Sequence, residues 1–153
     1  MLRISRLTDY GTLVLAHLSA GGGAMTSAAD VATATGITPP TVSKLLKNLA
    51  KAGLVTSSRG AQGGYRLSRD ARDISAADII DALEGPVQIT ACSAHGSQCD
   101  LEAHCNVGGA WQRINVAIRR ALGDINLLDL QRPRAPVPNF EFAGLPVTVE
   151  RKD

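Results

Sequence analysis

The sequence of residues 27–53, SAADVATATGITPPTVSKLLKNLAKAG, predicts two short helices joined by a tight turn. Ser27, followed three residues later by Asp30, is a variant of the capping box, so the first helix begins there and stops at Gly36. Thr38 is a suitable N-cap for the second helix, and the prolines that follow are tolerated in a first turn, where a missing N–H has no helical partner. A short link that contains glycine is typical of a helix-turn-helix motif.

The elements on either side extend this motif into a larger unit. Residues 4–19 predict an amphipathic helix, because apolar residues recur there at helical spacing. Residues 54–57 and 65–67 are β-prone and flank a glycine-rich turn, and residues 75–83 predict a further capped helix. Three helices followed by a two-stranded hairpin is the order of a winged helix-turn-helix. We therefore expect a mainly α fold with a small β-hairpin wing, and assign residues 1–85 to a winged-helix DNA-binding domain.

Beyond residue 85 the sequence divides into three parts. Residues 86–107 form a cysteine-rich loop that we expect to bind a cluster. Residues 108–130 contain a helix with an apolar stripe at helical spacing, made by Trp111, Ile114, Ile118 and Leu122. Such a stripe on an isolated helix needs a partner, so we expect a long C-terminal dimerisation helix and a homodimer. Residues 131–153 hold four of the seven prolines and little periodicity, which predicts an irregular tail.

Charge is divided unevenly along the chain. Residues 1–72 carry nine Lys and Arg against three Asp and Glu, whereas residues 73–153 carry seven against eleven. A basic half is the electrostatic footprint of phosphate binding, although charge alone fits ordinary surface variation equally well. Together with the order of the elements, it favours a double-stranded DNA operator as a partner. The expected DNA contacts come from the second helix of the motif and from the wing, through Thr38, Thr41, Ser43, Lys44, Lys47, Arg59 and Arg66.

The chain has three cysteines, all within 14 residues: Cys92, Cys99 and Cys105. An odd number argues against a disulfide framework, and the spacing is not the CxxC of a zinc knuckle. Residues 73–110 hold six acidic residues and no Lys or Arg, so no local cation compensates thiolates there, and a multivalent metal centre would supply the counter-charge. Iron–sulfur clusters usually take four protein ligands. The candidates for the fourth ligand are His95, His104 and Asp9.

Other classes of function find less support. The N-terminus lacks an apolar block followed by a small-residue cleavage site, and no segment free of charges approaches membrane-spanning length, so we expect a cytoplasmic protein with no membrane partner. A structural zinc site that uses His95 or His104 as a fourth ligand is an alternative to a cluster. The sequence has no P-loop, no dinucleotide fingerprint and no convincing Cys–His–Asx set, so it does not predict an enzyme.

Three segments of the chain resemble a known family. They are LTDYG at residues 7–11, AKAGLVTSSRGAQGGYRLSR at residues 50–69 and CNVGGAWQRINVAIRRAL at residues 105–122. Together with the spaced cysteines, they make the chain similar, over about residues 1–130, to the bacterial winged-helix iron–sulfur transcription regulators that include IscR and NsrR. The last segment is most similar to the regulators of the Suf iron–sulfur assembly operon.

The resemblance implies a homodimer whose C-terminal helices cross. It also implies an iron–sulfur cluster near the dimer interface, held by the counterparts of Cys92, Cys99 and Cys105. The implied function is a regulator that senses this cluster and controls iron–sulfur assembly genes of the Suf type. The alternatives on the same fold are a nitric-oxide-sensing repressor and a regulator with a structural zinc or thiol redox site.

The resemblance also bears on the fourth ligand. In IscR-like members a histidine three residues after the last cysteine completes the site, but here that position is Gly108. In NsrR-like members an N-terminal aspartate of the partner subunit completes it, and Asp9 matches that position. We therefore favour Asp9 over His104 and His95. The absence of the IscR-like histidine leaves both a [2Fe–2S] and a [4Fe–4S] cluster open.

Overall fold

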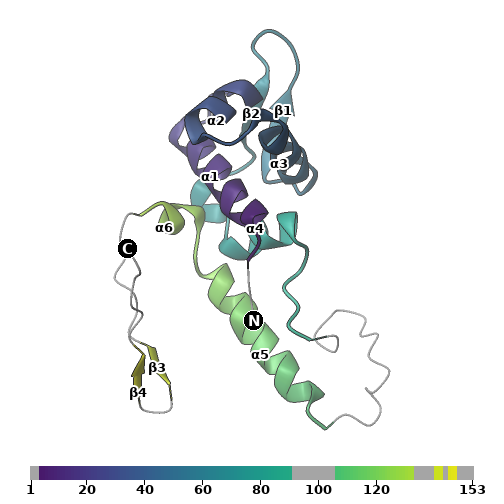
Figure 1. Ribbon diagram of the computed structural model, residues 1–153, viewed down its shortest axis with the longest axis vertical. Helices are drawn as coiled ribbons and strands as arrows, with labels where there is room; N and C mark the ends of the chain where they lie inside the picture. Colours follow the sequence, from purple (N-terminus) through teal and green to yellow (C-terminus); the bar gives the residue numbers. More distant parts are fainter. Residues whose placement is uncertain (1–3, 91–105, 133–139, 143–144, 148–153) are drawn as a thin grey trace.

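The computed structural model describes residues 4–90, 106–132, 140–142 and 145–147 of the chain (Figure 1). In chain order the elements are α1 (Arg6–Ala20), α2 (Ala28–Thr35), α3 (Pro39–Lys51), β1 (Val55–Ser58), β2 (Gly64–Leu67), η1 (Ala71–Asp73), α4 (Ala76–Leu83), α5 (Gly108–Gly123), α6 (Leu127–Gln131), β3 (Phe140–Phe142) and β4 (Leu145–Val147). Here η1 is a single turn of 3-10 helix. Helices α1 to α4 and the β1–β2 hairpin form one end of the molecule, and α5 runs from there toward the other end.

The first helix of the predicted helix-turn-helix begins and ends where its local sequence requires. The Ser27 hydroxyl accepts a hydrogen bond from the backbone N–H of Asp30 (3.1 Å) and donates one to its carboxylate (2.6 Å). Helix α2 ends at Gly36, whose φ of 69° lies in the left-handed region that glycine adopts without steric cost. Both features were predicted from the sequence and are confirmed.

Helix α3 begins after Thr38 as predicted, but without a hydrogen bond from the Thr38 side chain to the helix backbone. Proline occupies the first two positions of α3, so Pro40 at the second has no N–H to donate, and the Thr38 side chain receives none from Thr41 at the third. The Thr38 hydroxyl lies instead 2.9 Å from the hydroxyl of Thr41.

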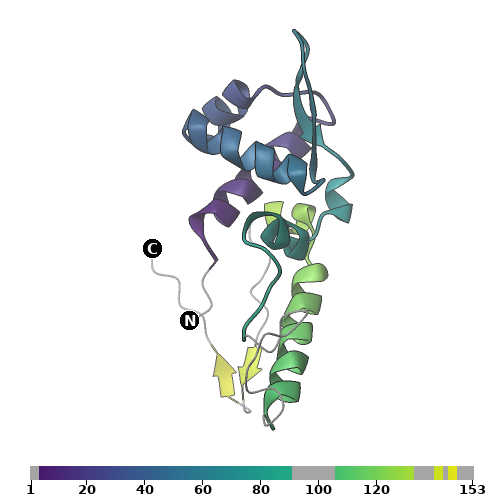
Figure 2. The ribbon, with the colours of Figure 1, turned by 90° about the vertical axis from the view of Figure 1, so that its right-hand side faces the viewer.

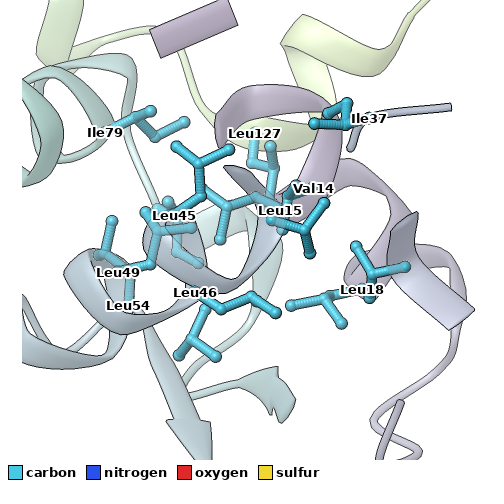
Figure 3. Packing of buried hydrophobic residues seen from close by; sticks show 14 of the residues in the cluster. Val14, Leu15, Leu18, Ile37, Leu45, Leu46, Leu49, Leu54, Ile79 and Leu127 are labelled. Atoms are coloured by element: carbon cyan, nitrogen blue, oxygen red, sulfur yellow. The ribbon is translucent and has the colours of Figure 1, made fainter. Parts of the chain in front are cut away.

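An aliphatic core joins α1, α3, the base of the hairpin and α6 (Figure 3). Its most deeply buried members are no more than 2% exposed, and include Val14, Leu15, Leu18, Leu45, Leu46, Leu49, Leu54 and Leu127. The core is aliphatic because the chain has only two Phe, two Tyr and one Trp. Full burial of one leucine side chain contributes about 1.5–3 kcal/mol, so this cluster accounts for much of the stability of the domain.

The hairpin forms the predicted wing. Strands β1 and β2 pair antiparallel, with Val55 opposite Leu67 and Ser58 opposite Gly64. The wing is also joined to the turn after α1, because Thr26 and Tyr65 exchange two backbone hydrogen bonds of 3.0 and 2.8 Å. The mainly helical fold with a small hairpin wing is thereby confirmed.

The segment after α5 returns to the core, which the sequence did not predict. The backbone N–H of Leu127 donates to the carbonyl of Ile74, and that of Ala76 donates to the carbonyl of Ile125, both at 2.8 Å. Leu127, at the start of α6, is fully buried. Five helical residues are too few to show a hydrophobic period, so only the tertiary structure reveals that this segment anchors α5 to the winged domain.

Helix α5 matches the helix predicted from residue 108 and extends away from the bundle (green in Figure 2). Of its 16 residues only Asn115 is buried, while Trp111 is 40% and Ile114 is 44% exposed. Near its last turns, the Arg119 guanidinium donates to both oxygens of Asp81 on α4, one bond measuring 3.0 Å. Both side chains are partly exposed, so this pair contributes at most about 1 kcal/mol. Within the described ranges no helix is long and apolar enough to cross a membrane.

The tail is less irregular than the sequence suggests. Strands β3 and β4 pair antiparallel, with Phe140 opposite Val147 and Phe142 opposite Leu145. Each strand has three residues, which is too short for an alternating pattern to stand out in a sequence rich in proline.

A substitution at Gly64 tests the close approach of the wing to the α1–α2 turn. A Cβ on Gly64 would lie 2.6 Å from the carbonyl oxygen of Thr26, a backbone atom that cannot move aside. We expect Gly64→Ala to lower the free energy of unfolding by about 1–3 kcal/mol, measured by urea denaturation. The control is Gly123→Ala in α5, where no atom lies within 4 Å of the added carbon and stability should hold or rise slightly. Equal destabilisation of the two variants would contradict this packing.

Candidate nucleic-acid interface

Helix α3 has one face in the core and the other in solvent. Its buried residues are Val42, Leu45, Leu46 and Leu49. Its exposed residues include three lysines at helical spacing, Lys44, Lys47 and Lys51. Because the buried leucines fix the rotation of α3 about its axis, the lysine ammonium groups are held on the outer surface. There they are available to a phosphate backbone.

The hydroxyl groups predicted to reach base edges gather at the N-terminal end of α3. Thr38 is exposed, whereas Thr41 and Ser43 are half-buried. The contact between the Thr38 and Thr41 hydroxyls places two groups that donate and accept hydrogen bonds side by side. The N-terminal residues of the second helix are the ones that meet base edges in a helix-turn-helix, and these three residues lie at that end of α3; their contact with DNA stays a prediction.

The two predicted wing contacts lie at different heights of the hairpin. Arg59 is exposed and directly follows β1, so it belongs to the tip. Arg66 is also exposed but lies within β2, opposite Thr56. The structure thus supports the expectation that Arg59 flanks the tip and places Arg66 nearer the base. A Cβ at Gly63 would lie 2.4 Å from the Ser58 carbonyl oxygen, so the narrow tip requires glycine at that position.

The carboxylate proposed as a ligand lies in an apolar groove. Asp9 is exposed on α1 and borders a groove of about 530 Å³ between α1, α4, α5 and α6, whose other lining residues are uncharged and include Leu13, Ile79 and Leu122. The Asp9 carboxylate makes no hydrogen bond or ion pair with any residue in the described part of the chain. A carboxylate beside apolar surface, with no donor facing it, is a ready acceptor for a cation.

The remaining metal-site predictions fall on residues that the structure does not describe. Cys92, Cys99 and Cys105 lie outside the described ranges, as do His95 and His104. Among the described residues, no three His, Cys, Asp or Glu side chains converge on one point, so Asp9 belongs to no such cluster there. The donor set itself fits an iron–sulfur cluster, because thiolates are its usual protein ligands and other residues occasionally replace one of them.

Glu84 was not singled out by the sequence analysis, although it holds the start of α1. Its Oε1 accepts from the backbone N–H of Ser5 (2.9 Å) and from the hydroxyl of Thr8. The hydrogen bond from Thr8, followed by that from Ser5, holds the pKa of the Glu84 carboxyl below its ordinary value. These bonds tie the turn that carries Asp9 to the end of α4, where the cysteine-rich loop begins. Glu84 is separated from Thr8 by 76 positions and from Ser5 by 79 positions in the chain, so no local sequence pattern could have revealed these hydrogen bonds.

The sequence of the chain is similar to a known family and to several bacterial proteins. The model of one family, Rrf2, described as an iron-dependent transcriptional regulator, matches residues 4–133. "Protein rrf2" of Nitratidesulfovibrio vulgaris is 32% identical over 138 residues, which cover 90% of this chain and 92% of that protein. "Protein aau3" of Rhizobium meliloti is 29% identical over 140 residues, covering 91% of this chain and 90% of that protein.

Solved structures of transcription regulators are also similar to this chain. CymR (YrzC), the global cysteine regulator of B. subtilis, matches with 32% identity and a TM-score of 0.61, covering 85% of this chain and 96% of CymR. IscR of T. potens also matches with 32% identity and a TM-score of 0.61, covering 85% of this chain and 86% of IscR. The winged-helix fold inferred from the elements is the fold of these neighbours.

The lysine face of α3 can be tested by its effect on DNA binding. We expect Lys44→Ala to weaken binding to duplexes of every sequence, because a lysine at a phosphate responds to charge and not to bases. The slope of log affinity against log salt concentration should fall in magnitude by about one unit, measured by fluorescence anisotropy at several salt concentrations. Arg113→Ala removes the same charge from an exposed position on α5 and serves as the control. A wild-type slope for Lys44→Ala would exclude α3 as the docking helix.

Proposed function

Because the chain belongs to the Rrf2 family of transcription regulators, the group that includes IscR and NsrR, we propose that it binds operator DNA as a homodimer whose affinity depends on an iron–sulfur cluster. The family assignment makes the chain a winged-helix transcription regulator. The observation that carries the DNA-binding part of the proposal is the division of α3 into a buried leucine face and an exposed lysine face.

In this proposal α3 enters the major groove and the wing reaches the adjacent minor groove. Thr38, Thr41 and Ser43 face base edges, while Lys44 and Lys47 face phosphates. Arg59 at the slim glycine-rich tip is drawn into the minor groove by its negative potential. Two copies related by a two-fold axis would place their α3 helices about 34 Å apart, so we expect a pseudo-palindromic operator.

The exposed surface of α5 supports a homodimer. A helix with one buried residue gains little stability from its own protomer, and an isolated helix of 16 residues is marginal in water. The exposed sides of Trp111 and Ile114 continue into the half-buried Ile118 and Leu122, the same stripe that the sequence shows. The α5 helix of a second copy would bury this stripe.

The cluster, when bound, supplies a centre that responds to oxidation or to small reactive gases. We assign its ligands to the Cys92, Cys99 and Cys105 thiolates and to the carboxylate of Asp9 from the partner subunit. The length of α5 favours the partner's Asp9. Within one protomer Asp9 borders the same groove as Leu122, in the last turns of α5, and the rise from Gly108 to Leu122 is about 21 Å. The three residues from Cys105 to Gly108 span at most about 10 Å, which is too short to bring Cys105 back along α5 to the Asp9 of its own protomer.

The same contacts offer a route from the ligand site to the DNA-binding helix. Asp9 lies on α1, whose Val14 and Leu15 belong to the core that also holds the leucines of α3. A change in what the Asp9 carboxylate binds would therefore act on a helix that is packed against α3. Because Glu84 ties the start of α1 to the end of α4, displacement of the cysteine-rich loop would act on the same helix.

We place this regulator in the cytoplasm and assign it to iron–sulfur assembly genes of the Suf type, because the segment from residue 105 to residue 122 resembles the regulators of that operon most. Anaerobic purification followed by iron and sulfide analysis tests the cofactor and distinguishes [2Fe–2S] from [4Fe–4S]. A colourless protein that retains zinc would replace the cluster with a structural zinc site. Reversible bleaching by nitric oxide with release of DNA would favour the nitric-oxide-sensing repressor.

If α5 forms the dimer interface, a charged residue introduced into its apolar stripe should disrupt the dimer. We expect Ile114→Asp to convert the protein to monomers, because the aspartate would be buried without a partner in the interface. Light scattering coupled to size exclusion measures the mass. Val116→Asp is the matched control, since Val116 is 65% exposed and points away from the stripe by helical spacing. A monomeric wild-type protein, or dimers of both variants, would contradict this interface.

The assignment of Asp9 predicts a difference between two variants. Asp9→Ala should fold and dimerise but lose its cluster faster in air than the wild type, because three cysteines leave one ligand position of the cluster open. His104→Ala should lose it at nearly the wild-type rate. The decay of visible absorbance after anaerobic reconstitution measures both rates. The reverse order of the two variants would transfer the fourth position to His104 and leave the cysteine ligands unaffected.

A further inference from the structure

A second cavity, of about 610 Å³, lies at the base of the wing. Its walls come from the end of α1, the two strands of the wing, η1 and α6, and it includes no residue of α3 and none of the groove that Asp9 borders. Gly22 and Gly23 form part of its rim, with φ of 60° and 88°, and no atom lies within 4 Å of a Cβ built on either residue. The turn therefore requires glycine for its conformation, and it adds no side chain that would cover the opening.

The cavity carries an excess of positive charge. Arg66, Arg69 and Arg72 line it, against one acidic residue, Asp70. The Asp70 carboxylate is already engaged, because it accepts a hydrogen bond of 2.9 Å from the backbone N–H of Arg72 and caps η1.

The three arginines differ in how many hydrogen bonds and ion pairs their guanidinium groups make within the protein. Arg69 donates to the carbonyl oxygen of Asp73 (2.8 Å) and to the carboxylate of Asp78 (3.1 Å). Arg66 and Arg72 are exposed and have no hydrogen bond or ion pair from their guanidinium groups to any described residue. Two uncommitted guanidinium groups thus line one concave site.

The chemistry of the lining defines the ligand. A guanidinium group presents a planar fork of N–H donors that matches a carboxylate or a phosphate with two parallel hydrogen bonds. Leu18, Leu67 and Leu128 add apolar surface that accepts a short hydrocarbon segment. We propose that this cavity is an effector site for a small organic dianion, a dicarboxylate or a phosphomonoester, whose anionic groups pair with Arg66 and Arg72.

The cavity lies between the wing and α6, so a ligand bound there would affect the wing. Arg66 and Leu67 belong to the wing, whereas Leu128 belongs to α6, which is joined to the core through the Leu127–Ile74 hydrogen bond. A bound dianion would draw the Arg66 guanidinium toward the cavity and neutralise it, and so remove a cation from the wing. We therefore expect the dianion to lower the affinity for DNA, and this expectation rests on the proposed function. The expectation that the dianion binds in the cavity does not depend on that function.

The test is a titration of the full-length protein followed by NMR of the arginine Nε–H groups, assigned with single Arg→Gln variants. The probes are succinate for a dicarboxylate and glycerol 3-phosphate for a phosphomonoester, with sodium chloride at equal ionic strength as the reference. We expect saturable shifts of the Arg66 and Arg72 signals with at least one probe and none with chloride. Arg72→Gln should weaken the binding about tenfold or more, because one charged hydrogen-bonding partner is lost. Arg132→Gln, whose side chain is 73% exposed and outside the lining, should bind like the wild type.

Three outcomes would overturn the proposal. The first is the absence of saturable shifts with both probes, and the second is unchanged binding by Arg72→Gln. The third is a shift of the Arg72 signal on addition of duplex DNA but not of either probe, which would assign the cavity to the DNA interface. Since Arg72 is not among the proposed DNA contacts, Arg72→Gln without any dianion should bind DNA like the wild type. Failure of DNA binding in the wild type would instead count against the proposed function alone.

Discussion

The burial of the α3 leucines against α1 is the constraint on which the DNA-binding half depends. Leu45, Leu46 and Leu49 are at most 1% exposed, and loss of one such side chain typically costs about 2–5 kcal/mol. That cost fixes the rotation of α3, and with 3.6 residues per turn it leaves Lys44 and Lys47 on the outer surface. One packing arrangement therefore both stabilises the domain and presents its charged face. A small rotation of α3 would lose buried area as well as alter the DNA contacts.

Two short backbone pairings attach the other elements to this core. The Thr26–Tyr65 bridge holds the wing against the turn after α1, and the bridge between Ser75 and Asn126 holds the end of α5 beside α4. Leu127 completes the second attachment by entering the core. Backbone hydrogen bonds, the buried Leu127 and the Arg119–Asp81 pair thus hold the proposed dimer helix relative to the core that contains α3.

Two concave sites in the described part of the protein are bordered by charged groups that have no ion-pair partner there. The Asp9 carboxylate borders an apolar groove, and the Arg66 and Arg72 guanidinium groups line the cavity at the wing. Other charged groups are paired within the protein, as in Arg69–Asp78 and Arg119–Asp81, whereas the lysines of α3 are exposed to solvent. Around Asp78 burial raises the carboxyl pKa, but the hydrogen bonds from Ser75 and the charge of Arg69 outweigh that effect and the pKa lies below its ordinary value. Departures from such local satisfaction are expected where a protein binds something, which is the common basis of both proposals.

The sequence by itself determined the features that rest on neighbours within one or two helical turns. These are the Ser27–Asp30 cap, the end of α2 at Gly36, the two faces of α3 and the glycine-rich wing, because caps and periodicity act over three or four residues. It also identified Thr38 as the N-cap residue, but not the absence of a hydrogen bond from its side chain to the helix backbone, since the Thr38 hydroxyl lies instead beside that of Thr41. Only the tertiary structure decided the return of Leu127 to the core, the hold of Glu84 on the start of α1, and the arginine-lined cavity. Each of these joins residues far apart in the chain, and their proximity depends on how whole helices pack, which local patterns do not encode.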